Sequence, residues 1–290
     1  MLVILAPFDA LACPLDGEPL NQSEKTWQCA RGHSFDVARQ GYIHLLPVQK
    51  KKSLEPGDSK DMIAARQRFL AQGFYDPISS AVNEAVMRAS EGGETICCLD
   101  AGCGEGYYLR KLSAALTDKT KCALIGNDIS KWAVLKAAQQ QRTGVRWIVA
   151  SNANLPIQTD TLDVVLSLFG FPIYNEFSRV LRPGGILIQV DAGPDHLREL
   201  REIIYPELKP EGNVRELPSG YELVEENRMT YVQALDKQEQ IFDLLAMTPH
   251  LYRASAEGKA KAEALDSIMV TVDVILRSFR SVQANPAPNE

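Results

Sequence analysis

The stretch Leu99-Asp100-Ala101-Gly102-Cys103-Gly104-Glu105-Gly106 decides the fold of this 290-residue chain. It follows an apolar, strand-like segment at 95–99 and precedes a helix-like segment at 107–112. Glycines at a strand-to-helix turn permit positive φ angles and let a ligand approach the backbone closely. The G-x-G-x-G spacing differs from the G-x-G-x-x-G of dinucleotide sites, and it lacks the Gly-Lys-Ser/Thr of a P-loop. The Asp before the glycines favours a ligand with an ammonium group over a pyrophosphate.

Strand-like and helix-like segments alternate after this turn. Four further apolar segments indicate strands, at 122–128, 145–150, 163–169 and 186–190. Helices are predicted between them, and the last of these, Phe177 to Leu181, ends at the helix-stopping residues 182–185. Alternation at this spacing predicts an α/β fold with a mostly parallel, doubly wound sheet.

Composition limits the classes of protein that this chain can represent. No apolar run reaches the roughly 20 residues that span a bilayer, and Asp9 interrupts an N-terminus that lacks the basic start of a signal peptide. The six cysteines do not suggest a disulfide framework, and Cys97, Cys98 and Cys122 are expected to be small buried apolar side chains. A cytoplasmic location follows. The net charge of −6 argues against broad nucleic-acid binding but allows a local basic patch.

Cysteine and histidine recur in the first fifty residues at a spacing typical of zinc sites. Cys13 and Asp16 form one pair, and Cys29 and His33 form a second, with twelve residues between the pairs. Two such turns can hold a tetrahedral zinc ion, although Asp16 stands where a cysteine is usual. The alternative is a zinc-free unit held by its apolar residues. We keep both interpretations open.

A basic and structure-breaking segment follows this unit. Lys50-Lys51-Lys52 precedes Glu55-Pro56-Gly57-Asp58-Ser59, which indicates either a solvated linker or a strip that contacts phosphates together with Arg66 and Arg68. A helix is predicted from Ser59, its N-cap, to Ala71, and a second from Pro77 to Ala89. The joint between them, residues 73–76, could fold over a ligand of the α/β domain.

These features together resemble a known family. The residues that carry the resemblance are Cys13-Pro14-Leu15, Cys29 to His33, Phe35-Asp36, Gly41-Tyr42-Ile43-His44-Leu45-Leu46-Pro47-Val48-Gln49, Pro56-Gly57-Asp58-Ser59, Ala65-Arg66, Phe69-Leu70, Gly102 to Tyr108, Arg182-Pro183-Gly184-Gly185, Gly193-Pro194, His196-Leu197 and Met247-Thr248-Pro249. The glycine loop looks like the S-adenosylmethionine loop of class I methyltransferases. Over nearly its whole length the chain resembles the bacterial 23S rRNA (guanine-N1)-methyltransferases.

The resemblance implies a domain organisation and partners. A zinc-ribbon-like domain that recognises an rRNA hairpin would cover residues 1–48, and a class I (Rossmann-like) methyltransferase domain would cover 49–280. Residues 281–290 would form a disordered tail. Members of the family act as dimers on 23S rRNA, so a homodimer is expected, with no membrane contact. Asp16, in place of the second zinc cysteine, is where this chain departs from the family.

The resemblance also implies a cofactor site for S-adenosylmethionine. The predicted cofactor-binding residues are Tyr75, Asp100, Gly102, Gly104, Gly106, Tyr107, Tyr108, Asp128, Ser151, Asn152 and His196. Asp100 and the loop backbone would hold the methionine end, and Asp128, which ends the second strand, would accept the ribose hydroxyls. Ser151 or Asn152 would contact the adenine edge by analogy with the fold. The predicted metal ligands are Cys13, Asp16, Cys29 and His33.

Methyl transfer to guanine N1 also needs a base, because this nitrogen carries a proton. Asp191, at the end of the fifth strand, is the candidate base, and Phe171 is the candidate for stacking on the guanine, with Phe169 as an alternative. Two other functions compete with rRNA methylation. One is a small-molecule methyltransferase that lost RNA recognition, and the other is a non-catalytic protein that binds RNA or S-adenosylmethionine.

Overall fold

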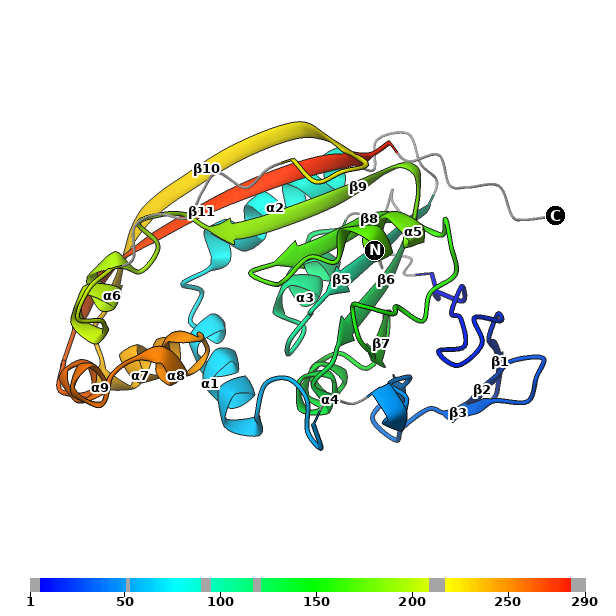
Figure 1. Ribbon diagram of the computed structural model, residues 1–290, viewed down its shortest axis with the longest axis horizontal. Coiled ribbons are helices and arrows are strands. Elements are labelled where there is room, and N and C mark those ends of the chain that lie inside the picture. Colours follow the sequence, from blue (N-terminus) through cyan, green and yellow to red (C-terminus); the bar gives the residue numbers. More distant parts are fainter. Residues whose placement is uncertain (1–5, 51–52, 90–94, 117–120, 209–216, 283–290) are drawn as a thin grey trace.

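An eight-stranded sheet forms the centre of the molecule (Figure 1). The computed structural model describes residues 6–50, 53–89, 95–116, 121–208 and 217–282. The strands lie in the order β10-β11-β9-β8-β5-β6-β7-β4. Their bounds are β4 Tyr42–His44, β5 Thr95–Ala101, β6 Lys121–Asp128, β7 Val145–Val149, β8 Leu162–Leu168, β9 Leu181–Ala192, β10 Tyr221–Leu235 and β11 Ile268–Ser281. The strands from β4 to β9 pair in parallel, whereas β11 runs antiparallel to both β9 and β10. The predicted fold class is confirmed.

Helices and the N-terminal segment cover the two faces of this sheet. The helices are α1 Lys60–Ala71, α2 Asp76–Ala89, α3 Tyr107–Ala115, α4 Lys131–Gln140, α5 Tyr174–Val180, α6 Arg198–Ile204, α7 Gln238–Ala246, α8 His250–Arg253 and α9 Ala256–Glu263. Apolar residues of α2, α3 and α4 pack in one core against one face of the sheet. Apolar residues of α5 and of the N-terminal segment form a second core against the other face. Both faces are therefore buried, as the apolar strands require.

The N-terminal segment is bound to the edge of the large sheet. It forms a small antiparallel sheet from β1 Asn21–Ser23, β2 Thr26–Gln28 and β3 Ser34–Asp36. The next strand, β4, pairs in parallel with β7, and Leu11 forms an isolated bridge with Ile157. The short 3-10 helix η1, Val48–Lys50, then leads toward α1. The predicted domain boundary at residue 48 stays a prediction. β4, which precedes this boundary, is an edge strand of the large sheet.

A group of helices lies at one end of the sheet (Figure 1). Helices α6 to α9 sit together with α1, at the end that the long antiparallel strands β10 and β11 reach. Arg68 of α1 forms an ion pair with the buried Asp243 of α7, with 2.5 Å between Nη2 and Oδ1. This contact fixes α1, the helix that directly precedes residues 73–76, the joint predicted to fold over a ligand.

The predicted element boundaries hold with two differences. The helix expected from Phe177 to Leu181 is α5, Tyr174–Val180, and the strand after it begins earlier than expected. Ser59 caps α1, because its hydroxyl accepts a hydrogen bond from the backbone N–H of Met62. The strand expected at 186–190 already begins at Leu181, which pairs with Leu162 of β8 before an irregularity in the register. Gly184, with φ of 78°, lies in this irregular part. Proline and glycine at 182–185 thus end the helix and begin a strand without an intervening loop. Among the described helices, none is long and apolar enough to cross a bilayer.

Candidate active site and metal centre

The glycine loop is tied to the end of the neighbouring strand β6. Gly102, Gly104 and Gly106 have φ angles of 104°, 55° and 82°, in the left-handed region where glycine is favoured. The backbone N–H of Gly102 donates to the carbonyl oxygen of Asn127 at 2.8 Å. The backbone N–H of Gly104 donates to Oδ2 of Asp128 at 2.9 Å. The carbonyl of Asn127 and the carboxylate of Asp128, both at the end of β6, therefore hold the loop in one conformation.

Asp100 is a buried carboxylate with no partner among the described residues. It is 1% exposed, and both of its oxygens lack a hydrogen bond. Burial, with a smaller contribution from the charge of Asp128, raises the pKa of Asp100 to about 8. The hydroxyl of Tyr108 is also buried without a partner. Buried polar groups are costly unless something satisfies them, and a cationic ligand would satisfy a carboxylate. These residues fit a ligand that carries an ammonium group.

Polar side chains from three strands meet at the same edge of the sheet. Asn152, just after β7, donates from Nδ2 to the carbonyl oxygen of Ala101 at 3.2 Å. Its Oδ1 accepts a hydrogen bond from Nδ2 of Asn127 at 2.8 Å. Ser151 instead binds its own turn, through a hydrogen bond from the N–H of Ala153 to its hydroxyl. The structure thus brings Asn152 to the start of the glycine loop, and its predicted contact with the adenine edge stays a prediction. It also adds Asn127, whose Oδ1 has no partner among the described residues.

Three aromatic rings from distant parts of the chain form a cluster beside this edge. The ring of Phe169 lies 5.9 Å from that of Tyr75, with 29° between the planes, and 5.8 Å from that of His196. Phe169 has φ of 55°, which is unusual for a residue other than glycine and marks a strained position. Tyr75 and His196 are buried, whereas Phe169 is 39% exposed. The sequence predicted Tyr75 and His196, but it gave no reason to prefer Phe169 over Phe171.

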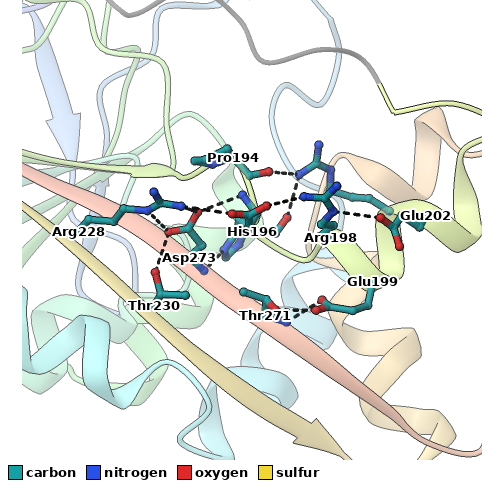
Figure 2. Close-up of polar contacts among 11 residues, drawn as sticks. Pro194, His196, Arg198, Glu199, Glu202, Arg228, Thr230, Thr271 and Asp273 are labelled. Atoms are coloured by element: carbon teal, nitrogen blue, oxygen red, sulfur yellow. Dashed lines mark hydrogen bonds and ion pairs between the residues drawn. The ribbon is translucent and has the colours of Figure 1, made fainter.

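His196 is held in one neutral tautomer (Figure 2). Its Nδ1 accepts a hydrogen bond from the backbone N–H of Asp273 at 3.2 Å. Burial lowers the pKa of His196 to about 4, so the ring is neutral at physiological pH and its proton lies on Nε2. Nε2 therefore donates to the hydroxyl of Tyr75, 3.3 Å away. As a result, the hydroxyl of Tyr75 accepts this hydrogen bond and does not donate its own proton to His196.

The loop that carries His196 is fixed by the antiparallel strands β10 and β11 (Figure 2). Asp273, fully buried on β11, accepts hydrogen bonds from Nε and Nη2 of Arg228 at 2.8 and 2.9 Å. It also accepts one from the N–H of Asp195 at 3.0 Å. The next residue after His196, Leu197, has φ of 54°. Such a strained residue persists only where its surroundings hold it firmly.

The predicted catalytic residues lie apart from this cluster. Asp100 is in register with Leu166, and Leu166 with Ile188. Side chains alternate along a strand, so Asp191 points to the opposite face of the sheet from Asp100. Its carboxylate accepts a hydrogen bond from Nε2 of Gln189 at 2.6 Å and pairs with Arg277 at 3.3 Å. Phe171 lies in the loop after β8 and is 83% exposed. Their roles as base and stacking residue stay predictions.

The two tyrosines after the glycine loop have different surroundings. Tyr107 begins α3, and its hydroxyl donates to Oδ1 of Asp76 at 2.6 Å. Tyr107 thus links the loop to the start of α2. Tyr108 has its hydroxyl buried near Asp100, whose charge is among the smaller influences that add to burial in raising the pKa of Tyr108. Of the two, only Tyr108 shares the unsatisfied environment of Asp100.

The four predicted metal ligands converge in the N-terminal unit. One ligand atom from each of Cys13, Asp16, Cys29 and His33 lies within 4.8 Å of the others. Nδ1 of His33 lies 3.5 Å from Sγ of Cys13, 3.4 Å from Sγ of Cys29 and 2.9 Å from Oδ2 of Asp16. Tetrahedral zinc with ordinary bond lengths places sulfur and nitrogen ligands ~3.5 Å apart. The donor set and its spacing therefore fit a zinc ion.

Comparisons with known proteins agree with both parts of the chain. Residues 11–54 match a zinc-ribbon family model described as RlmA, N-terminal, and residues 98–185 match one described as a methyltransferase domain. A 23S rRNA (guanine(748)-N(1))-methyltransferase of Streptomyces fradiae is 31% identical over 87% of this chain and 89% of its own length. YxjB of Bacillus subtilis (strain 168), provisionally named as a 23S rRNA (guanine-N(1)-)-methyltransferase, is 34% identical over 92% of this chain and 95% of its own length.

Proposed function

The chain belongs to the 23S rRNA (guanine-N1)-methyltransferase family, and from this we propose that it methylates N1 of a guanine in a hairpin of 23S rRNA. The methyl donor is S-adenosylmethionine, which supplies the methyl group from a sulfonium centre. The observation that carries the proposal is the unpartnered, buried Asp100 beside the glycine loop. It gives the ammonium group of this donor a specific counter-charge, whereas a pyrophosphate would be repelled.

Each residue at the sheet edge contacts a different part of the methyl donor. Asp100 binds the ammonium group, and Asp128 accepts the ribose hydroxyls while it continues to hold the N–H of Gly104. Asn152 or Ser151 contacts the adenine edge. Tyr75 and His196 close the other side, where Phe169 extends the aromatic surface toward solvent. Positioning of this kind is the main help that a protein gives to an in-line displacement, with roughly 7–11 kcal/mol available from orientation.

The acceptor side includes the remaining predicted residues. Phe171, exposed in the loop after β8, is the candidate to stack on the extruded guanine. Asp191 is the candidate base for the N1 proton, although its pairing with Arg277 must be broken for it to act. The zinc-ribbon unit is proposed to recognise the hairpin together with the exposed Lys50. Lys51 and Lys52 lie outside the described residues.

Oligomeric state and location complete the proposal. A homodimer would let two copies enclose one RNA, as expected from the family resemblance. A cytoplasmic location agrees with a ribosomal RNA substrate. It also agrees with the cysteines, since all six are free in the structure.

Mapping of methylated guanines in 23S rRNA tests this function directly. We expect mass spectrometry to find one N1-methylguanine that is absent in cells without the gene and returns with the wild-type gene. Purified protein should transfer a labelled methyl group to a hairpin that contains this guanine. Identical rRNA in both strains would contradict the proposal and favour a small-molecule acceptor. Binding of S-adenosylmethionine without transfer to RNA would favour a non-catalytic protein.

Binding of the cofactor should release a proton from Asp100. The pKa of Asp100 is about 8 without ligand, so the carboxyl is mostly protonated at pH 7, and a bound ammonium group favours its ionised form. We expect S-adenosylhomocysteine, titrated calorimetrically at pH 7 in buffers of different ionisation enthalpy, to release close to one proton. Affinity should rise with pH up to about 8 and then level off. The Asp100→Asn variant should bind more weakly and lose this proton release. Equal release by both proteins would show that another group titrates.

A further inference from the structure

The candidate cofactor site has acids for the positive groups of its ligand but no assigned partner for the negative one. S-adenosylmethionine carries an α-carboxylate next to its ammonium group. The predicted binding residues include Asp100 and Asp128, and none of them is cationic at neutral pH because His196 is neutral. Resting on the proposed function, we propose that Arg66 of α1 binds the α-carboxylate of the methionine moiety.

The guanidinium of Arg66 lies directly on the glycine loop. A Cβ atom added to Gly104 would stand 3.3 Å from Nη1 of Arg66 and 3.7 Å from its Cδ. Its charge also reaches the end of β6: burial raises the pKa of Asp128, and Arg66 is among the groups that oppose this rise. Arg66 is therefore close both to the loop that would hold the methionine end and to the acid that would hold the ribose.

Two separate segments hold this guanidinium in place, and a third supports one of them. Nη1 donates to Oδ2 of Asp58 at 2.6 Å, and Nη2 donates to the carbonyl oxygen of Met247 at 3.1 Å. The backbone carbonyl of Asp58 in turn accepts a hydrogen bond from the hydroxyl of Ser130 at 2.7 Å. Gly57, with φ of 85°, packs so closely on Ser130 that a Cβ would stand 2.8 Å from the serine Cβ. The segment 57–66 thus packs over the end of β6, and this packing places the guanidinium of Arg66 against the glycine loop.

The unused donors of Arg66 suit a carboxylate. A guanidinium has five N–H groups in a planar fork, and the contacts among the described residues use two of them. This fork matches a carboxylate in a bidentate geometry. Ribose hydroxyls are neutral and already have Asp128 as their expected acceptor. The other guanidinium at the loop, that of Arg110, donates both to the buried carboxylate of Glu105 and to its backbone carbonyl. Arg66 is also paired, but its acid Asp58 is 31% exposed, so the Arg66 fork is the more accessible of the two to a ligand.

Two related ligands distinguish the amino-acid group, which carries the α-carboxylate, from the rest of the cofactor. S-adenosylhomocysteine carries the amino-acid group, whereas 5′-methylthioadenosine lacks it, and both are uncharged at sulfur. We expect Arg66→Gln to lower the affinity for S-adenosylhomocysteine about 10- to 100-fold, since a charge-assisted contact is lost. The affinity for 5′-methylthioadenosine should stay within about twofold of wild type. Arg66→Lys, which keeps the charge but not the fork, should lie between wild type and Arg66→Gln for S-adenosylhomocysteine.

Arg68→Gln is the matched control. Arg68 lies two residues further along α1 and docks this helix on Asp243, away from the glycine loop. It should lower the melting temperature but keep the wild-type ratio of the two affinities. Equal weakening of both ligands by Arg66→Gln would overturn the proposal, because Arg66 would then hold the pocket or the adenosine. Unchanged affinity for both would also overturn it. If wild type bound neither ligand, the proposed function itself would fail.

Discussion

An alanine at Gly106 should strongly destabilise the methyltransferase domain, whereas an alanine at Gly104 should leave it folded and weaken cofactor binding. A Cβ at Gly106 would stand 2.5 Å from the ring of Trp147 and 3.1 Å from Cβ of Ala137. The ring cannot move aside, because it is fully buried, packs on Gly126 on another side and donates from Nε1 to the carbonyl of Gln141. The φ of 82° adds backbone strain for any other residue.

Overpacking and strain together should cost about 3 kcal/mol at Gly106, or roughly 10 °C in Tm for a domain of this size. At Gly104 the added methyl meets only the flexible end of Arg66, at 3.3 Å, so the folding cost should be about 1 kcal/mol. The same methyl would stand where the ligand approaches the loop, and the affinity for S-adenosylhomocysteine should fall at least about tenfold. Thermal melting and calorimetric titration of both variants measure these effects. Equal losses of Tm, or an unchanged affinity in Gly104→Ala, would contradict the assigned roles of the two glycines.

The features that the sequence could predict are local. Glycine spacing, apolar strands and the acid at the end of β6 each depend on a few neighbouring residues, and their positions are confirmed. The start of β9 was predicted too late, because Leu181 becomes a strand residue only through pairing with Leu162. The sequence also could not predict on which face of the sheet Asp191 lies, because this depends on the register between strands.

The rest of the site depends on contacts between distant residues. Tyr75 and His196 are 121 positions apart, and the tautomer of His196 is set by Asp273, a further 77 positions along. The sequence placed Arg66 in a basic strip and among the residues of the family resemblance, but not in the cofactor site, because its contact with Gly104 arises from the packing of α1. Phe169 and Phe171 have the same chemistry and lie in the same loop region. Only the fold shows that one packs on Tyr75 while the other faces solvent.

Removal of zinc should unfold the N-terminal unit while the central sheet remains folded. The strands β1, β2 and β3 have three residues each, and such a small sheet is not stable by itself in water. Structural zinc contributes about 10–16 kcal/mol in zinc-finger peptides, so we expect its loss to outweigh the burial of the unit's apolar side chains in the second core. The unit also carries Leu11 and β4, which bind the edge of the large sheet. Loss of the metal should therefore expose this edge as well.

Metal analysis of protein prepared without chelator should find about one zinc ion per chain. Cys29→Ser should abolish zinc binding, and Cys97→Ser, outside the cluster, should leave it unchanged. Asp16→Cys should bind zinc more tightly than wild type, because a thiolate is a softer and stronger ligand than a carboxylate. Chelator should increase hydrogen exchange across residues 11–46 and in β7, but not in β5 or β8. Protein that contains no zinc, with exchange in 11–46 unaffected by chelator or added metal, would show that its apolar residues alone hold this unit. In that case Asp16 would mark the loss of the metal rather than its retention with a weaker ligand.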